Sequence, residues 1–148
     1  MENYNSYIGR LDYSKFIQFA KDKGKVHIYH KNDFFIEQNK MSDQVGWIET
    51  GAFRYVHTDK NGKEHVVEYS FAKELVCDYS SFIHQSTSLV NIQAMSECVV
   101  YLLSYQDAIA YLETDMETIR FGKQVVDALY EMMYHRYLDL YCDSPEES

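Results

Sequence analysis

Two histidines, His57 and His65, stand on either side of an Asn-Gly pair and are candidates for metal or acid–base chemistry. Asn-Gly supplies the positive φ angles of a tight hairpin turn, so the two imidazoles are expected to lie opposite one another on neighbouring strands, with Glu68 nearby. Imidazole and carboxylate groups are common ligands of transition metals. Polar pairs across a solvated sheet face are far more frequent than metal centres, and we favour that interpretation.

The three cysteines, Cys77, Cys98 and Cys142, are far apart and odd in number. Their spacing is not that of a zinc site or a disulfide framework, so we expect free thiols in a cytoplasmic protein. The sequence contains no phosphate-binding loop, no nucleophile elbow and no glycine-rich dinucleotide motif. It therefore predicts neither an enzyme nor a definite cofactor.

The acidic charge balance limits the partners of this chain. Its 148 residues include 14 Lys and Arg against 23 Asp and Glu, which leaves a net charge of −9. Such a chain is not expected to bind a nucleic-acid backbone by itself. No apolar run approaches the roughly 18 residues of a membrane-spanning helix, and Met1 to Arg10 lacks a secretory signal pattern, so we expect no membrane partner.

The periodicity of apolar residues predicts one domain of residues 1–148 with three stretches. A helix is expected over about residues 10–24, because Phe16, Phe19 and Ala20 share one face. Short β-prone runs then recur over residues 25–104, with sharp reversals expected at Gly51 and at Asn61-Gly62. Short, frequent strands are typical of a closed or double-sheet architecture. The predicted fold class is therefore mainly β with flanking helices (α+β).

A long amphipathic pattern ends the chain. A short helix is expected over residues 105–113, and a long one over about 115–142, with Asp115 as its N-cap but without the Glu or Gln of a full capping box. A stripe with a seven-residue period requires a partner surface. The helix either covers the β-roll or pairs with a second copy, and we favour a homodimer. The expected interface residues are Ile119, Val126, Leu129, Met133 and Leu140.

The last residues have the composition of a helix start. Ser144, Pro145 and two glutamates fit the N-cap, first position and first turn of a helix. We therefore expect the natural protein to continue beyond residue 148. A solvated acidic tail is the alternative interpretation.

In residues 45–70, Gly51 follows one expected strand and the Asn61-Gly62 hairpin follows the next. This stretch resembles the core of the cyclic nucleotide-binding fold. The likeness extends over about residues 10–143, and the order of a helix, a β-roll, a short helix and a long helix resembles the effector domain of bacterial Crp/Fnr-type transcription regulators. The resemblance implies a double-stranded β-helix or jelly roll followed by a dimerisation helix. It also implies that DNA is bound only through a C-terminal helix-turn-helix domain, which is missing from this chain.

The resemblance places the ligand site in residues 77–90, called the cassette below. Family members carry Gly-Glu-Leu, whose Glu holds the ribose hydroxyl, and then an Arg that holds the cyclic phosphate with nearby backbone N–H groups. The corresponding residues here are Cys77-Asp78-Tyr79 and Ser88-Leu89-Val90. Loss of a charge-assisted contact to a buried phosphate costs about 2–5 kcal/mol. Tight binding of cyclic AMP is therefore not expected, and we expect either a different effector, a small molecule or another nucleotide, or none.

The remaining polar and aromatic residues favour a small neutral or weakly charged effector of unknown identity. Under the resemblance, serines and Asp78 would form one wall, and aromatic residues of the long helix would close over them. The candidate ligand-binding residues are Cys77, Asp78, Tyr79, Ser80, Ser81, Ser88, Leu89, Tyr130, Met133 and Tyr134. A ligand that contacts both roll and helix would alter helix pairing and hence the spacing of two DNA-binding domains.

Two other classes of protein fit parts of the pattern. A cupin-like metal enzyme would use His57, His65, His84 and neighbouring glutamates, although the His-x-His pair of that fold is missing. A stand-alone dimerisation or interaction module would keep the roll and the helix, and it predicts a natural stop after Ser148.

Overall fold

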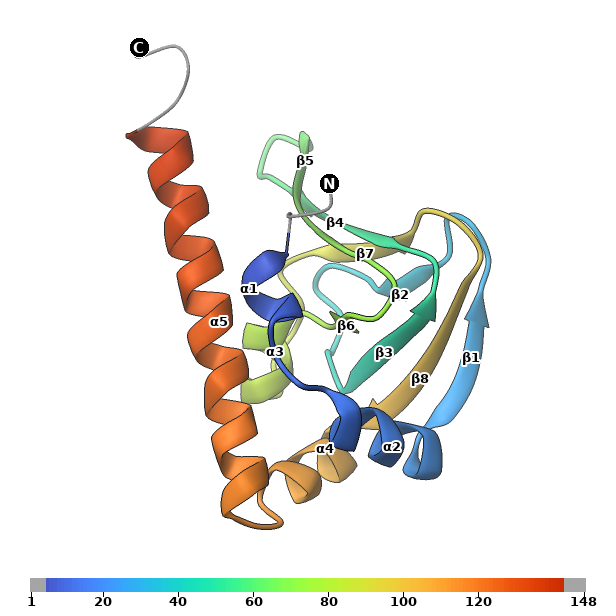
Figure 1. Cartoon of the computed structure of the whole chain (residues 1–148). Coiled ribbons are helices and arrows are strands. Elements are labelled where there is room, and N and C mark those ends of the chain that lie inside the picture. The colour runs from blue at the N-terminus through green and yellow to red at the C-terminus, as the bar shows by residue number, and fades with distance from the viewer. Residues whose placement is uncertain (1–4, 143–148) are drawn as a thin grey trace. The chain divides into compact units, whose positions relative to one another are not determined.

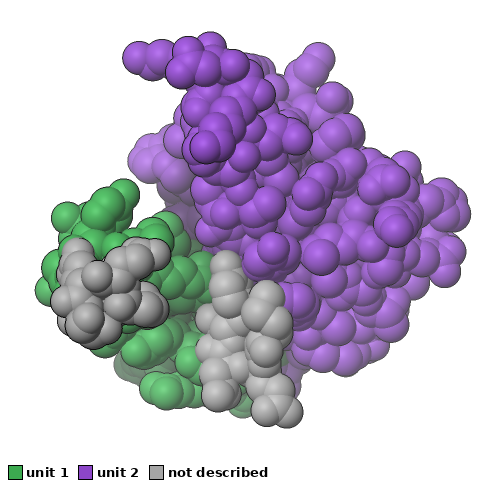
Figure 2. Space-filling model, turned by 90° about the horizontal axis from the view of Figure 1, so that it is seen from above, with its two compact units in different colours: residues 1–13, 111–148 green, residues 14–110 purple. Residues whose placement is uncertain are grey.

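The computed structural model describes residues 5–142, so the expected helix start at residues 144–147 lies outside the described residues. The chain divides into two compact units, coloured separately in Figure 2. One unit consists of residues 14–110. The other combines residues 1–13 with residues 111–148, and the boundary between the units falls within helix α4 (Tyr105–Leu112).

The larger unit is a roll of two four-stranded antiparallel sheets (Figure 1). Helix α2 (Ser14–Lys23) precedes the roll, and α3 (Tyr79–His84) lies between its sixth and seventh strands. The sheets have the orders β1-β8-β3-β6 and β2-β7-β4-β5. The strands are β1 (Lys25–Tyr29), β2 (Phe34–Ile36), β3 (Gln44–Thr50), β4 (Phe53–Thr58), β5 (Glu64–Ser70), β6 (Leu75–Val76), β7 (Asn91–Ala94) and β8 (Cys98–Ser104). This architecture confirms the predicted mainly β jelly roll with flanking helices.

The core of the roll is built from alternate residues of both sheets. Ile48 and Val100 come from one sheet and Phe53 and Ile92 from the other, and all four are fully buried. Because side chains in a strand point alternately to opposite faces, Tyr55 of β4 also points into this core, two residues after Phe53. Burial of such apolar side chains is the main driving force for closing the two sheets on one another.

The two expected reversals are present, but they differ in backbone conformation. Gly51 has φ +97°, and a Cβ atom there would lie 2.5 Å from the Cys98 sulfur, so only glycine fits between β3 and β4. In the β4–β5 hairpin only Gly62 has a positive φ, of +81°, and Asn61 does not. The Asp59 carboxylate instead accepts bonds from the backbone N–H groups of Asn61 and Lys63, and this favours a longer loop than the expected tight turn.

Three short elements have no counterpart among the expected ones: α1 (Ser6–Gly9), β6 and α3. A strand of two residues and helices of four and six residues are too short to show the repeating apolar patterns from which strands and helices are predicted.

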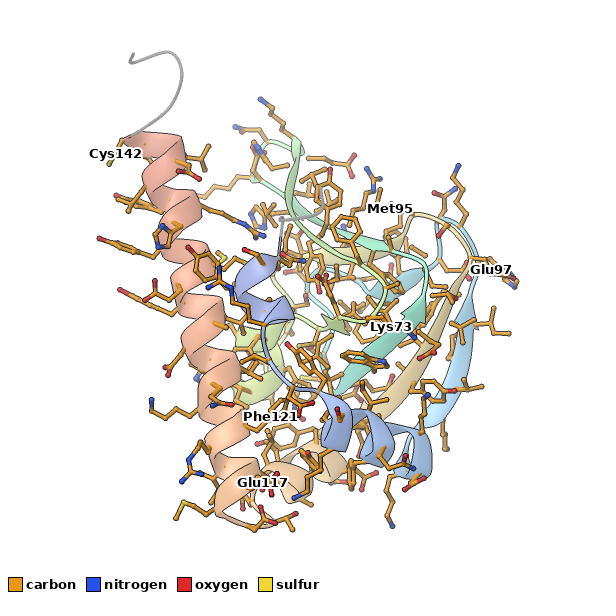
Figure 3. All side chains as sticks on the ribbon, in the orientation of Figure 1. Lys73, Met95, Glu97, Glu117, Phe121 and Cys142 are labelled. Carbon is orange, nitrogen blue, oxygen red and sulfur yellow. The ribbon has the colours of Figure 1, made fainter. Side chains whose placement is uncertain are left out.

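The smaller unit is dominated by α5 (Met116–Tyr141), a helix of 26 residues. Asp115 accepts a bond from the Thr118 backbone N–H, and the Thr118 hydroxyl accepts one from Asp115 N–H, so threonine completes the reciprocal capping box that was not expected. Tyr13 meets Phe121 edge to face at 5.6 Å between ring centroids (Phe121 is labelled in Figure 3). Along the same helix, Arg136 donates to the Asn5 side chain at 2.7 Å. None of the helices in the described residues is long and apolar enough to span a bilayer.

Candidate functional site

Asp78 is the centre of a hydrogen-bond cluster in the cassette, immediately after β6. Its Oδ2 atom accepts bonds from the Ser81 hydroxyl at 2.6 Å, the Ser88 hydroxyl at 3.1 Å and the Leu89 backbone N–H at 3.0 Å. Asp78 is the N-cap residue of α3, yet its side chain makes no bond to the backbone of that helix. The carboxylate therefore joins the first turn of α3 to the loop that follows the helix.

Ser88, which the sequence resemblance matches to the family's arginine, is completely buried. Its hydroxyl hydrogen has two acceptors within reach, Asp78 Oδ2 and the Val90 carbonyl at 2.7 Å. The Ser88 backbone N–H donates to the Lys40 carbonyl, and the Ser88 carbonyl accepts from Asn39 N–H. The hydroxyl and both backbone polar groups of Ser88 are therefore all engaged within the chain.

Tyr55 closes the cassette on its inner side. The tyrosine oxygen lies 2.8 Å from the Ser70 hydroxyl and accepts a bond from the Cys77 backbone N–H at 3.3 Å. Burial raises the pKa of Tyr55 well above its ordinary value, so the phenol stays protonated at neutral pH. Sequence reasoning did not identify Tyr55, although its alternation with Phe53 in a β-prone run indicates an inward position, where a tyrosine needs a polar partner.

Cys77 has the environment of an inert thiol. Burial, reinforced by the negative charges of Asp78 and Glu68, raises the pKa of the Cys77 thiol far above its usual range. The thiolate is the form that binds metals and attacks electrophiles. Cys77 therefore contributes its backbone N–H to the cassette, and its sulfur is not suited to catalysis.

The structure gathers five of the predicted ligand-binding residues: Cys77, Asp78, Ser81, Ser88 and Leu89. The other two from this region lie on α3 outside the hydrogen-bond cluster. Tyr79 is half-buried, and burial raises the pKa of its phenol. Ser80 is exposed, and its carbonyl lies 2.8 Å from His84 Nδ1.

Tyr130, Met133 and Tyr134, the remaining predicted ligand-binding residues, belong to the smaller unit. All three are exposed on α5, and the rings of Tyr130 and Tyr134 stack with their centroids 5.9 Å apart. Their participation in ligand binding stays a prediction.

The predicted interface stripe on α5 is largely exposed. Ile119, Val126, Met133 and Leu140 are each at least 42% exposed, whereas Leu129 is half-buried. Tyr130 and Tyr137 are also exposed and follow Val126 and Met133 by four residues, which places them on the same side of the helix. The exposed stripe, defined here as these six exposed residues, is therefore broader and more aromatic than expected.

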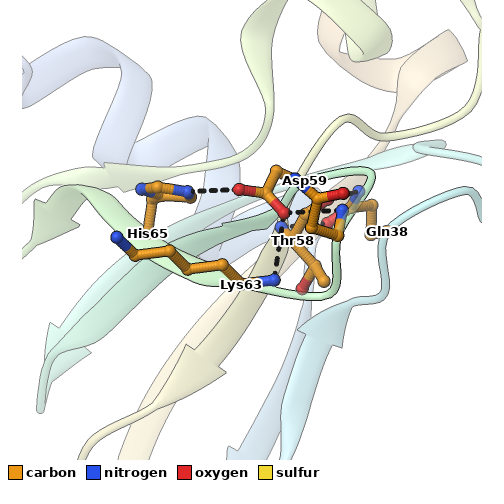
Figure 4. A network of polar contacts seen from close by, with 6 residues as sticks. Gln38, Thr58, Asp59, Lys63 and His65 are labelled. Carbon is orange, nitrogen blue, oxygen red and sulfur yellow. Dashed lines mark hydrogen bonds and ion pairs between the residues drawn. The ribbon is translucent and has the colours of Figure 1, made fainter.

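His57 and His65 are in register across the hairpin, as expected, but they bond to different partners. His57 Nδ1 lies 2.7 Å from the Leu89 carbonyl, and His65 Nε2 lies 2.9 Å from Asp59 Oδ2 (Figure 4). Gln38 binds the adjacent Thr58 backbone through both its amide atoms. Within residues 5–142 no three His, Cys, Asp or Glu side chains gather as a metal site.

Comparison with known proteins finds one matching family model and many solved structures with a similar fold. The family model described as the cyclic nucleotide-binding domain matches residues 26–115. No curated protein sequence matches the chain. A transcriptional regulator from Thermotoga maritima is 18% identical with a TM-score of 0.68, and the match covers 88% of this chain and 98% of that one.

Two longer proteins share the fold. The c-di-GMP responsive global regulator CLP from Xanthomonas campestris is 16% identical with a TM-score of 0.68, over 87% of this chain and 65% of CLP. The catabolite activator protein from Thermus thermophilus is 17% identical with a TM-score of 0.65, over 93% of this chain and 61% of that protein. The chain thus spans less than two thirds of the length of either regulator. At these identities the likeness establishes the fold.

Proposed function

The chain belongs to the cyclic nucleotide-binding domain family, and we propose that it is the ligand-sensing and dimerisation domain of a Crp/Fnr-type transcription regulator. The observation that carries this proposal is that the family's roll leads through α4 into a 26-residue helix with an exposed apolar stripe. We favour pairing of this stripe with a second copy over packing of the stripe on the roll.

Dimerisation through α5 follows from the composition of the exposed stripe. Its six residues are apolar or aromatic, and contiguous apolar surface on a long helix is typical of helix–helix pairing. Aromatic and Met side chains are also enriched at protein interfaces. Pairing of two copies of α5 along this stripe would bury apolar surface that is exposed in the single chain.

DNA binding is assigned to a further domain. The net charge of −9 opposes direct contact between this chain and a phosphate backbone. The fold relatives CLP and the Thermus activator are longer than the matched segment, which leaves room for a second domain in each. In our proposal, a helix-turn-helix domain follows α5, and the two helices of the dimer set the distance between two such domains.

The effector is proposed to be a small molecule other than tightly bound cyclic AMP. Ser88 offers one neutral hydroxyl where a cyclic phosphate would require a cationic side chain, and that hydroxyl is already engaged by Asp78 and Val90. Binding at the cassette is proposed to alter the pairing of α5, and this coupling is the regulatory step.

The gene beyond codon 148 tests the proposal directly. We expect roughly 70 further residues with a helix-turn-helix pattern, and we expect the longer protein to select DNA sites with two half-sites from a random pool. A stop codon directly after Ser148 would instead support a stand-alone dimerisation module. Failure of the longer protein to retain any DNA sequence would contradict the regulator proposal.

A further inference from the structure

We infer that β1 is a docking edge for an extended, acidic segment of a partner protein, which joins the sheet β1-β8-β3-β6 as an additional strand. The inference goes beyond the proposed function, because it involves neither the cassette nor α5. It rests on three properties of β1, which are a free edge, an exposed apolar face and a group of neighbouring lysines.

β1 is the outermost strand of its sheet (Figure 1). It pairs with β8 from Lys25 to Tyr29 without a register shift, and four of its five residues are exposed. No strand within residues 5–142 pairs with its other side. Such an edge presents backbone N–H and C=O groups to which a further strand can bind, as in peptide recognition by strand addition.

The other edge strands of the roll are less suited to accept an acidic strand. β6 has two residues and β2 has three, and the pairing of β2 with β7 contains a register shift. β5 is longer, but its register with β4 shifts between Tyr55 and Val56. It also carries two acidic residues, Glu64 and Glu68. Short strands and bulges protect sheet edges from pairing, and β1 is neither so short nor bulged.

The outward face of β1 is apolar and open to solvent. Tyr29 belongs to the core of the roll, so Ile28 and Val26 point to the opposite face of the sheet. Val26 is 56% exposed and Ile28 is 51% exposed. Their register partners on β8 are Tyr101 and Val99, which are half-buried. These four outward side chains form an apolar row that an added strand would extend.

Lysines lie beside this row, where β1 begins. Residues 21–31 contain four lysines and one aspartate, a net charge of +3 in a chain whose overall net charge is −9. Lys21, Lys23 and Lys25 are exposed, and the Lys21 ammonium lies 5.7 Å from the centre of the Tyr101 ring. Neither Lys23 nor Lys25 forms an ion pair with a described residue. This basic charge complements an acidic partner.

Nearby carboxylates leave the basic charge in place. The Glu49 carboxylate, on β3, is paired with the Lys73 ammonium at 2.6 Å. Glu97 lies 3.8 Å from the His30 ring, beyond the other end of β1. The one aspartate of the segment, Asp22, is already included in its net charge.

The same charge opposes a second copy of this chain as the occupant. Pairing of β1 with the β1 of another copy would bring together two segments that each carry a net charge of +3. Like charges on neighbouring strands are destabilising, and lysines at a sheet edge are a common protection against self-association. The lysines therefore select an acidic strand and reject a second copy.

A protein segment fits this surface better than a nucleic acid does. The backbone of an extended peptide can pair with β1, while its alternate side chains pack on Val26 and Ile28. A phosphate backbone would use the lysines alone. The apolar row and the free edge together therefore favour an acidic peptide.

Fluorescence anisotropy with a labelled peptide tests the inference on the 148-residue chain. The probe is a fluorescein-labelled peptide of about nine residues in which glutamate and valine alternate. One control peptide has lysine in place of glutamate, and the other has every backbone nitrogen methylated, which keeps the charge but removes the donors for strand pairing. We expect the probe to saturate the chain below about 1 mM and both controls to bind at least about tenfold more weakly.

Charge reversal locates the binding surface. The double variant Lys23→Glu, Lys25→Glu should weaken probe binding by about tenfold, because two attractive charges become repulsive. The matched control, Lys60→Glu with Lys63→Glu, makes the same change at exposed residues of the β4–β5 hairpin and should change the Kd by less than about twofold. The peptide controls need no variant, so they remain decisive if a variant does not fold.

Four results would overturn the inference. They are no saturable binding of the probe, equal binding of either control peptide, equal losses in the two double variants, and binding of a single-stranded DNA oligonucleotide as tight as that of the probe. The last result would show that the lysines serve a phosphate backbone.

Discussion

Tyr55 of β4 accepts a hydrogen bond from the backbone N–H of Cys77, 22 residues later in the chain, at 3.3 Å. This contact joins the centre of the β-roll core to the first residue of the cassette. Because the Tyr55 ring packs against core residues of both sheets, the position of the cassette backbone is fixed by the packing of the roll.

The Tyr55 hydroxyl is expected to contribute measurably to stability. Tyr55→Phe keeps the ring but leaves Cys77 N–H and the Ser70 hydroxyl without this partner, at a cost of about 1–3 kcal/mol. Urea denaturation measures the difference in the free energy of unfolding. Tyr141→Phe, which removes an exposed hydroxyl on α5, is the control and should change little. Equal stabilities for the two variants would contradict this role of Tyr55.

The β4–β5 hairpin should respond to acid through Asp59. The hydrogen bond from His65, followed by those from the Lys63 and Asn61 backbone, lowers the pKa of the Asp59 carboxyl below its ordinary value of 3.8. A carboxyl with a depressed folded-state pKa stabilises the protein above its unfolded pKa, and this contribution is lost as the pH falls through the folded pKa. The loss is therefore expected below about pH 4.

Carboxyl NMR titration of Asp59 checks this expectation. His65→Ala should raise the pKa of Asp59 toward 3.8, whereas His30→Ala, on another loop, should leave it unchanged. An Asp59 pKa of 3.8 or above in the unaltered chain would show that the hairpin network does not hold the ionised carboxylate.

The three thiols should differ sharply in reactivity. Cys142 is exposed at the end of α5 (Figure 3), Cys98 is buried, and burial holds the pKa of Cys77 far above neutrality. Under native conditions a disulfide reagent should therefore titrate one thiol rapidly, and the fast phase should disappear in Cys142→Ser. A fast phase that survives in Cys142→Ser but is lost in Cys77→Ser would show that the cassette thiol is activated.

Long periodic patterns in the sequence were sufficient to predict the roll, the long helix and the family resemblance, which the family match confirms. The contacts that close the cassette were not predictable in this way. The bond from Leu89 N–H to Asp78 depends on the path of a loop, and neither β6 nor α3 is long enough to show a period. The capping box was not predicted because residue 118 is a threonine and not a glutamate or glutamine. The Thr118 hydroxyl nevertheless accepts the bond from Asp115 N–H that a glutamate accepts in a capping box.

The pairing of α5 is the central claim, and sedimentation equilibrium of the 148-residue chain tests it most directly. We expect a dimer for the unaltered chain and a monomer for the double variant Val126→Glu, Met133→Glu, because two buried carboxylates per helix would have no partners. Gln124→Glu, an exposed change away from the stripe, is the control and should remain dimeric. A monomeric unaltered chain, or a double variant that stays dimeric, would contradict the account.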